Sequence, residues 1–276
     1  LAAAINRRRT FAIISHPYFN KTAPTEKLLL YGGAIHLAGA VKARRAQRHA
    51  TSDWMKLEQE RGISVTSSVM QFEYDGFQVN LLDTPGHMDF GEDTYRTLVA
   101  ADSAVMLLDN RRGVEERTRQ LFDVCRRRRM PIFAVVNKCD RVGEDPLKLL
   151  SDVEDELGIA CVAANWPIHR DGTFVGVYDR RHRRVHLFTR GEDHGAGRAA
   201  SALLDVSGPD DERIVEALGG SHSARAAVEK LAHDVLLLDE AGHEFDADAI
   251  AAGEQIPMYF ASALTNFGVE PFLEDF

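Results

Sequence analysis

Several short stretches of the sequence combine residue types that can hold phosphates and a divalent cation. The pair Lys21 and Thr22 offers an ammonium group for phosphate oxygens and a hydroxyl group for Mg²⁺. In DTPGH, which ends at His87, the carboxylate of Asp83 can hold Mg²⁺ through a water, and Gly86 leaves a backbone N–H open to a γ-phosphate. These residue types indicate chemistry on a nucleoside triphosphate.

Two further motifs indicate the base. In NKCD, the carboxylate of Asp140 can accept hydrogen bonds from the N1–H and the 2-amino group of guanine, a pair of donors that adenine lacks. A motif with three fixed residues occurs by chance in roughly a few percent of chains of this length, so order and context matter. Lys-Thr, Asp-x-x-Gly, Asn-Lys-x-Asp and Ser-Ala-Leu follow one another, each near the end of an expected strand. The candidate base-binding residues are Asn137, Lys138, Asp140, Ser262 and Ala263.

The elements that must position these residues alternate between strand and helix. This alternation predicts an α/β fold with a mainly parallel sheet of the P-loop NTPase type, helices on both faces, and ligands at the carboxyl ends of the strands. The expected strands are Phe11 to Ser15, Ser68 to Tyr74, Phe77 to Asp83, Ala104 to Asp109, Ile132 to Asn137 and Met258 to Ser262. The expected helices are Thr25 to Leu37, Asp89 to Ala101, Val114 to Arg127 and Pro146 to Leu157.

Two departures from the alternation are expected. Asp75-Gly76 separates two strand-like runs and indicates a hairpin, which would supply the one antiparallel edge of the sheet. Residues 165 to 255 contain a hairpin-like stretch, GTFVGVYDRRHRRVHLF, a Gly/Asp/Ser-rich stretch near 191 to 223, and an amphipathic helix from Ala224 to Glu240. We interpret them as an inserted α+β subdomain, after which the sheet resumes at Ile256.

The composition limits the class of protein. Hydrophobic residues make up 45% and charged residues 27%, as in ordinary globular proteins, and no apolar run is long enough for a membrane. We therefore expect a cytoplasmic protein with no membrane partner. Three widely spaced cysteines predict neither a disulfide framework nor a zinc site. The net charge of -9 argues against holding nucleic acid through the overall field.

Two basic runs have two interpretations each. The first, Arg126 to Arg129, closes an expected helix before Pro131, where cations complement the helix C-terminus. The second, Arg180 to Arg184, stands between two strand-like runs. Either run is a solvated end of an element or a local RNA-facing patch.

Longer stretches of the sequence carry a resemblance to known proteins: TFAIISHP, SDWMKLEQERGISVTSSVMQF, VNLLDTPGH, EDTYRTL, VNKCDR and NFGV. They resemble the translational GTPases, and among them the peptide chain release factor 3 family. The resemblance covers nearly the whole chain, and elongation factor G, a translocase GTPase, differs at SHP and EDTYRTL. The resemblance to the release factor 3 family implies a GTP-binding domain at residues 1 to 164 and 256 to 276. It also implies a ribosomal partner at the factor-binding site and a role in recycling the stop-codon-reading release factors. Because the chain begins with leucine and stops at Phe276, we expect the GTPase portion of a longer protein, with the family's downstream domains outside it.

The resemblance also implies roles for individual residues. Lys21 would bind the β- and γ-phosphates of GTP or GDP, and Thr22, Ser64 and Asp83 would bind Mg²⁺, with Gly86 at the γ-phosphate. His87 would position the attacking water. Simpler interpretations stay open: a surface lysine beside a capping threonine, a helix stop at Arg61-Gly62, and a structural histidine. His16 is interpreted as structural. The full set of nucleotide-binding candidates is Ser15, Asn20, Lys21, Thr22, Asp83, Gly86, Asn137, Lys138, Asp140, Ser262 and Ala263.

The phosphate-binding loop departs from the family pattern. Where the family has Asp-Ala-Gly before the lysine, this chain has Tyr18, Phe19 and Asn20. Asparagine tolerates positive φ better than most residues, but its side chain takes up space beside the β-phosphate, and two aromatic residues do not favour a tight loop of backbone N–H groups. Two hypotheses follow: a GTPase of the release factor 3 type, or a non-hydrolysing module with impaired nucleotide binding. An elongation factor G-like translocase is the same-class alternative.

Overall fold

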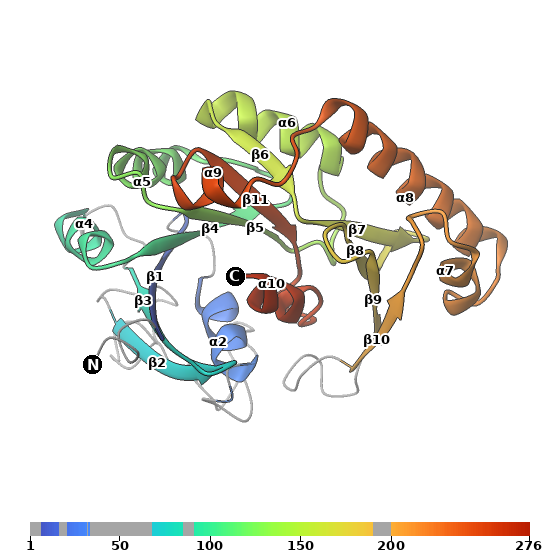
Figure 1. Cartoon of the computed structure of the whole chain (residues 1–276), viewed down its shortest axis with the longest axis horizontal. Coiled ribbons are helices and arrows are strands. Elements are labelled where there is room, and N and C mark those ends of the chain that lie inside the picture. Colours follow the sequence, from blue (N-terminus) through green and yellow to red (C-terminus); the bar gives the residue numbers. More distant parts are fainter. Residues whose placement is uncertain (1–6, 17–20, 32, 34–67, 85–90, 190–199) are drawn as a thin grey trace.

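The computed structural model describes residues 7–16, 21–31, 33, 68–84, 91–189 and 200–276 (Figure 1). Its main feature is a seven-stranded sheet in the order β2-β3-β1-β4-β5-β11-β6. All neighbouring strands pair in parallel except β2 and β3, which pair antiparallel. The mainly parallel α/β fold predicted from the sequence is confirmed. The strands are β1 (Arg8–Ile14), β2 (Ser68–Tyr74), β3 (Phe77–Asp83), β4 (Ser103–Asp109), β5 (Ile132–Asn137), β6 (Ala160–Ala163) and β11 (Gln255–Phe260).

Helices cover both faces of this sheet because successive strand residues point to opposite sides (Figure 1). On one face, Ala12, Met106 and Val136 share a buried cluster with residues of α4 (Gly91–Val99), α5 (Glu116–Arg127) and α6 (Pro146–Leu157). On the other, Ile13 and Val105 share a cluster with α2 (Thr22–Tyr31) and α10 (Val269–Asp275). Each of these strands is therefore buried on both sides. This is why its sequence is a continuous run of apolar residues rather than an alternation of apolar and polar residues.

The antiparallel edge forms at Asp75 and Gly76, as predicted. Both residues have positive φ, 46° and 76°, which is the geometry of a two-residue hairpin turn between twisted strands.

Several helices and strands begin or end at other residues than expected. Helix α2 starts at Thr22 rather than Thr25, and β11 ends at Phe260, so Ser262 stands in the loop beyond the strand.

A second, four-stranded sheet follows β6 and is antiparallel throughout, in the order β10-β9-β8-β7. It contains the predicted hairpin, and helix α8 packs against β7. The short elements β6, β7, β10, α7 and α9 were not expected from the sequence. Helix α9 packs on β11 of the first sheet, so the boundaries of the inserted subdomain stay a prediction. The elements are β7 (Asn165–Arg170), β8 (Thr173–Asp179), β9 (Arg184–Thr189), β10 (Ala200–Asp205), α7 (Glu212–Ala217), α8 (His222–Ala241) and α9 (Ala247–Ala251).

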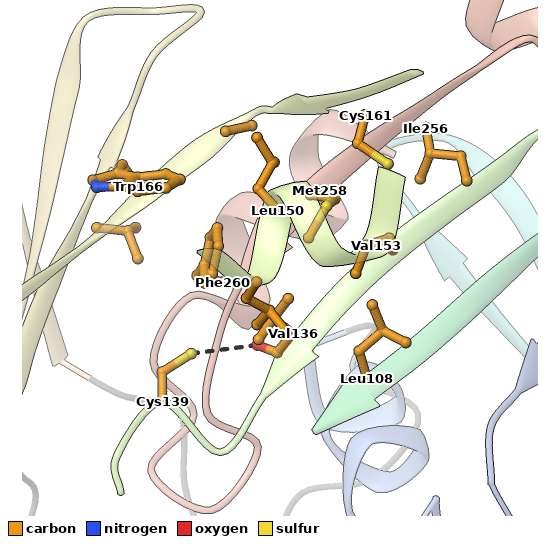
Figure 2. Close-up of a cluster of buried hydrophobic side chains, with 14 of the residues drawn as sticks. Leu108, Val136, Cys139, Leu150, Val153, Cys161, Trp166, Ile256, Met258 and Phe260 are labelled. Atoms are coloured by element: carbon orange, nitrogen blue, oxygen red, sulfur yellow. Dashed lines mark hydrogen bonds between the residues drawn. The ribbon is translucent and has the colours of Figure 1, made fainter. Parts of the chain in front are cut away.

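The two sheets are joined at the start of β7. The Asn165 side chain, 2% exposed, accepts a hydrogen bond from the Phe260 N–H at 2.7 Å and donates one to the Phe260 carbonyl at 3.3 Å. Its amide thus acts as one more strand partner for β11. Figure 2 shows Trp166 and Phe260 in one buried cluster with the α6 residues Leu150 and Val153. The two aromatic rings meet edge to face, with their centroids 5.1 Å apart.

We expect Asn165→Ala to destabilise the protein by about 2 to 5 kcal/mol, because it leaves a buried N–H and a buried carbonyl of β11 without their partner. Urea unfolding of the purified protein measures the change. The matched control is Gln71→Ala, which removes an exposed side-chain amide contact with Asn80 and should cost less than about 0.5 kcal/mol. Equal effects of the two substitutions would contradict the role given to Asn165.

The first basic run caps the ends of neighbouring helices. Arg126 donates to the carbonyl of Leu157, at the end of α6, at 2.9 Å. Arg128 donates to the carbonyls of Leu98 and Val99 at the end of α4. Cations at helix C-termini satisfy carbonyls that the helix leaves open. The helix-end interpretation is confirmed for these two arginines, but the ends they serve belong to other helices.

The second basic run is also engaged within the protein. Arg180 donates to the Ala163 carbonyl at 2.8 Å and to Asp239, Arg181 pairs with Asp275, and Arg184 pairs with Asp205. These ion pairs favour the structural interpretation of the run.

Among the described helices, none combines the length and the apolar character needed to cross a bilayer.

Candidate nucleotide-binding site

The predicted site residues that the structure describes gather at the carboxyl edge of the seven-stranded sheet. Asp83 closes β3, Lys21 follows β1, Asn137 closes β5, and Ser262 follows β11. Since these strands run parallel in one sheet, their carboxyl ends share one edge, which is where parallel α/β sheets bind ligands. Asn20, Ser64, Gly86 and His87 lie outside the described residues, as does the side chain of Thr22.

One end of the site holds a buried ion pair. The Nζ of Lys21 lies 3.6 Å from Oδ1 of Asp83 and donates to Oγ1 of Thr84 at 3.2 Å. Thr84 in turn donates to the carbonyl of Ile13 at 2.7 Å, which ties the end of β3 to β1. Lys21 directly precedes α2, and its side chain is only 4% exposed. A lysine at a helix N-terminus beside a carboxylate is a suitable place for a phosphate and its cation.

The first loop contributes two further contacts. Ser15 is buried, and its Oγ donates to the carbonyl of His16 at 3.3 Å. The Nδ1 of His16 lies 3.4 Å from Oε2 of Glu115, which precedes α5. This contact favours the structural interpretation of His16, and it links the first loop to the loop after β4.

At the other end of the site, Asn137 joins two loops. Its Oδ1 accepts from the backbone N–H of Lys138 and from that of Ala263, both at 2.8 Å. Lys138 has a positive φ of 71°, and the N–H of Cys139 donates to the Ala261 carbonyl at 3.1 Å. The Ala263 N–H is thus engaged within the protein. A hydrogen bond from this N–H to a bound guanine base would require sharing it with Asn137 or releasing it from Asn137.

The Asp140 carboxylate is oriented by the second of these loops. Ser262 donates through its Oγ to Oδ1 of Asp140 at 2.5 Å, and Nε of Arg141 lies 3.8 Å from Oδ2. A carboxylate oxygen has two lone pairs, so Asp140 keeps acceptor capacity for further donors. A planar pair of N–H donors, as on guanine, suits such a group.

A family model described as the elongation factor Tu GTP binding domain matches residues 6–276. The chain belongs to this family.

Individual relatives and a solved structure agree with the assignment. Peptide chain release factor 3 of Cyanothece sp. (strain PCC 7425) is 55% identical over 276 residues, which is 100% of this chain and 49% of the relative. The proteins of the same name from Acaryochloris marina and Trichodesmium erythraeum are 54% and 53% identical over the same shares. The chain thus spans about half the length of these relatives. A crystal structure of a protein from Thermus thermophilus superposes with a TM-score of 0.70 and 27% identity, covering 96% of this chain and 39% of that one.

Within this GTP-binding domain the structure adds a residue that the sequence reasoning did not select. Asp109, which closes β4, accepts from Nζ of Lys138 at 2.6 Å. Burial acts to raise the pKa of Asp109, but hydrogen bonds from Lys138 and the Arg111 backbone outweigh it, so its pKa is lowered. The pair borders a polar cavity of about 510 Å³ that is also lined by Arg112 and Glu115. Asp109 could have been selected from the sequence, because it is an acidic residue at the end of an expected strand on the same edge of the sheet.

The cysteine inside NKCD is structural in this domain. Cys139 is 3% exposed, and its thiol donates to the Val136 carbonyl at 3.4 Å, as Figure 2 shows. Burial raises the pKa of this thiol to about 12. Cys139 therefore points into the protein. All three cysteines are buried and free of disulfides.

The metal site expected for this family falls largely on residues outside the described part of the chain. Within the described ranges, no group of three or more His, Cys, Asp and Glu side chains is arranged to hold a metal ion. Mg²⁺ in nucleotide sites is typically held by one or two protein groups, together with phosphates and waters, rather than by an all-protein cage. The single carboxylate of Asp83 beside Lys21 fits that donor set.

Proposed function

We propose that this domain binds GTP and GDP with Mg²⁺ and hydrolyses GTP, as the nucleotide-binding part of a translation factor of the peptide chain release factor 3 type. One observation supports the proposal above all: the two ends of the candidate site differ in chemistry and lie on the same edge of the seven-stranded sheet. The Lys21 and Asp83 pair suits a phosphate and its cation, and the Asp140 carboxylate, oriented by Ser262, suits a guanine base.

Each end has a defined task in this proposal. Lys21 neutralises phosphate charge, and Asp83, with the hydroxyls of Thr22 and Ser64, would hold Mg²⁺, which neutralises charge on the phosphates during transfer. Asn137 holds the two base-binding loops together, and Asp140 reads the N1–H and 2-amino group. Gly86 and His87 are assigned to the γ-phosphate and the attacking water. Phosphoryl transfer depends mainly on placement and charge stabilisation, so a positioning histidine suffices.

The wider role extends to the full-length protein. The relatives named peptide chain release factor 3 support a ribosomal partner and a cytoplasmic site of action. Promotion of release-factor recycling, with the stop-codon-reading factors as partners, is the activity we propose. Because the chain covers about half of each relative, this activity belongs to the whole protein rather than to the domain alone.

A second candidate function follows from the altered first loop. Tyr18, Phe19 and Asn20 replace residues that the family uses to surround the β-phosphate with backbone N–H groups. This substitution favours a domain that keeps the fold and its ribosome contact but binds nucleotide weakly and does not hydrolyse it. Retention of DTPGH and NKCD favours the first candidate.

Titration with fluorescent GDP separates the two candidates. The GTPase proposal predicts saturable binding that unlabelled GDP displaces and ADP does not, because ADP offers Asp140 no pair of N–H donors. Absence of binding at millimolar GDP, in protein with an intact unfolding transition, would support the non-binding module instead.

A further inference from the structure

The loop that follows β11 is anchored by an aromatic side chain outside its base-binding residues. This loop, residues 262 to 267, begins at Ser262 and closes on itself where the Ser262 N–H donates to the Phe267 carbonyl at 2.8 Å. Gly268 follows with a positive φ of 76°, and a side chain there would meet the Phe260 carbonyl at 2.6 Å. The position of Phe267 therefore fixes the position of the residues that face Asn137 and Asp140.

Phe267 is held by the four-stranded sheet. Its ring stacks on Phe188 of β9, with the centroids 4.6 Å apart and an interplanar angle of 18°, and lies 6.0 Å from the ring of Phe174 of β8. Phe267 and Phe174 are each 2% exposed. Such aromatic pairs stabilise a contact beyond the apolar area that they bury. The rings that hold Phe267 thus belong to the four-stranded sheet, whereas the loop follows a strand of the seven-stranded sheet.

The NKCD loop is contacted by the same sheet at a second point. Nε2 of His169, on β7, lies 3.0 Å from the carbonyl oxygen of Cys139. A carbonyl can only accept, so Nε2 carries the proton and donates. The imidazole also packs against Phe174, with the ring centroids 5.4 Å apart. His169, Phe174, Phe188 and Phe267 therefore form one aromatic cluster that touches both base-binding loops.

We infer that this aromatic cluster makes the four-stranded sheet a brace for the base-binding loops, with Phe188 and His169 as positioning residues for guanine recognition. The inference rests on the proposed guanine-nucleotide binding. Asp140 must present its carboxylate in the plane of the base, and its orientation depends on Ser262, whose loop depends on Phe267. A residue on β9 thereby affects the selectivity of a site that it does not touch.

The energetic link is reciprocal. If the sheet holds the loops in their binding geometry, then nucleotide binding must stabilise the sheet contact by the same coupling. Loss of one stacked pair, worth about 0.5 to 1.5 kcal/mol, corresponds to about a twofold to tenfold change in affinity. We expect that change in the selectivity for the base, because the contacts that define the cluster run to the two base-binding loops.

The test compares Phe188→Ala and His169→Ala with the wild-type chain in two measurements. The first is the ratio of GDP to inosine diphosphate affinity, since inosine lacks the 2-amino group and the ratio reports the alignment of Asp140. We expect Phe188→Ala to lower this ratio about twofold to tenfold. The second is amide hydrogen exchange in the nucleotide-free protein, where residues 261 to 268 should exchange faster in Phe188→Ala and residues 137 to 141 faster in His169→Ala.

The matched control is Phe245→Ala. Phe245 is half-buried like Phe188, lies in the same inserted region, and packs under Arg181 at 4.1 Å rather than against a base-binding loop. It should change neither the affinity ratio nor exchange in the loops. Should Phe188→Ala lose its fold, Phe188→Leu keeps the apolar volume while removing the stacked ring.

The outcomes separate this inference from the proposed function. If the wild-type chain binds no GDP, the proposed function fails, and hydrogen exchange in the nucleotide-free protein alone decides the brace. If GDP binds but Phe188→Ala matches Phe245→Ala in the affinity ratio, or in exchange of residues 261 to 268, the brace is overturned.

Discussion

The triple substitution Tyr18→Asp, Phe19→Ala and Asn20→Gly is expected to raise GDP affinity about a hundredfold to ten-thousandfold. The glycine removes a side chain from the approach of the β-phosphate and restores a residue that adopts positive φ freely. Restoring two charge-assisted hydrogen bonds, at about 1.5 to 3 kcal/mol each, gives this range of affinity. Titration with fluorescent GDP measures the gain directly.

Two further variants locate the origin of the gain. Lys21→Ala in the restored background should abolish most of it, because the same phosphates need the ammonium group. GTP hydrolysis by the restored chain, joined to the remaining domains of the relatives and mixed with ribosomes, should rise, and His87→Ala should remove that rise. An unchanged GDP affinity would show that the first loop does not limit binding. Activity that persists in His87→Ala would refute the role proposed for His87.

Asp140→Asn is expected to weaken GDP binding by about a hundredfold or more and to improve binding of xanthosine diphosphate. The aspartate accepts from two N–H groups of guanine, whereas an asparagine has one acceptor oxygen and two donor hydrogens that oppose the 2-amino group. Xanthine carries a carbonyl in place of that amino group, so the asparagine NH₂ can donate to it. Loss of the acceptor charge, together with the repulsion between the asparagine NH₂ and the 2-amino group, accounts for the expected weakening of GDP binding by about a hundredfold.

Competition of both nucleotides against fluorescent GDP, in the restored-loop background if needed for signal, checks this exchange of specificity. The matched control is Asp152→Asn, which alters an exposed aspartate on α6 that pairs with Lys148 and should leave both affinities unchanged. If Asp140→Asn weakened GDP and xanthosine diphosphate equally, the effect would come from the lost Ser262 contact and not from base reading.

Much of the framework follows from local patterns in the sequence. The bounds of β2, β3, β5 and α6 match the expected ones, because their apolar runs end at strong signals such as Asp75-Gly76 and the N-terminal Pro146. The less regular pieces were not predictable in this way. Strand β6 has only four residues, and β10 lies in a stretch rich in Gly, Asp and Ser, where propensity favours turns. Strand β10 forms because this stretch pairs with β9, Arg184 to Thr189.

The basic run at the end of α5 illustrates the same limit. The sequence indicated that Arg126 and Arg128 stand at a helix end. It could not indicate that they cap α6 and α4, because that depends on how three helices pack on one face of the sheet. The tertiary contacts of Arg126 and Arg128 therefore favour the structural interpretation of the run.

The candidate site divides in the same way. The sequence by itself determined which groups stand at the strand ends: an ammonium, a carboxylate for a cation, and a carboxylate for a base. Only the tertiary structure decided that Lys21 lies 3.6 Å from Asp83, that Asp109 holds Lys138, and that the Ala263 N–H is engaged by Asn137. The physical reason is distance along the chain. Asn137 and Ala263 are 126 residues apart, and they meet because β5 and β11 pair as neighbours, which no local propensity encodes.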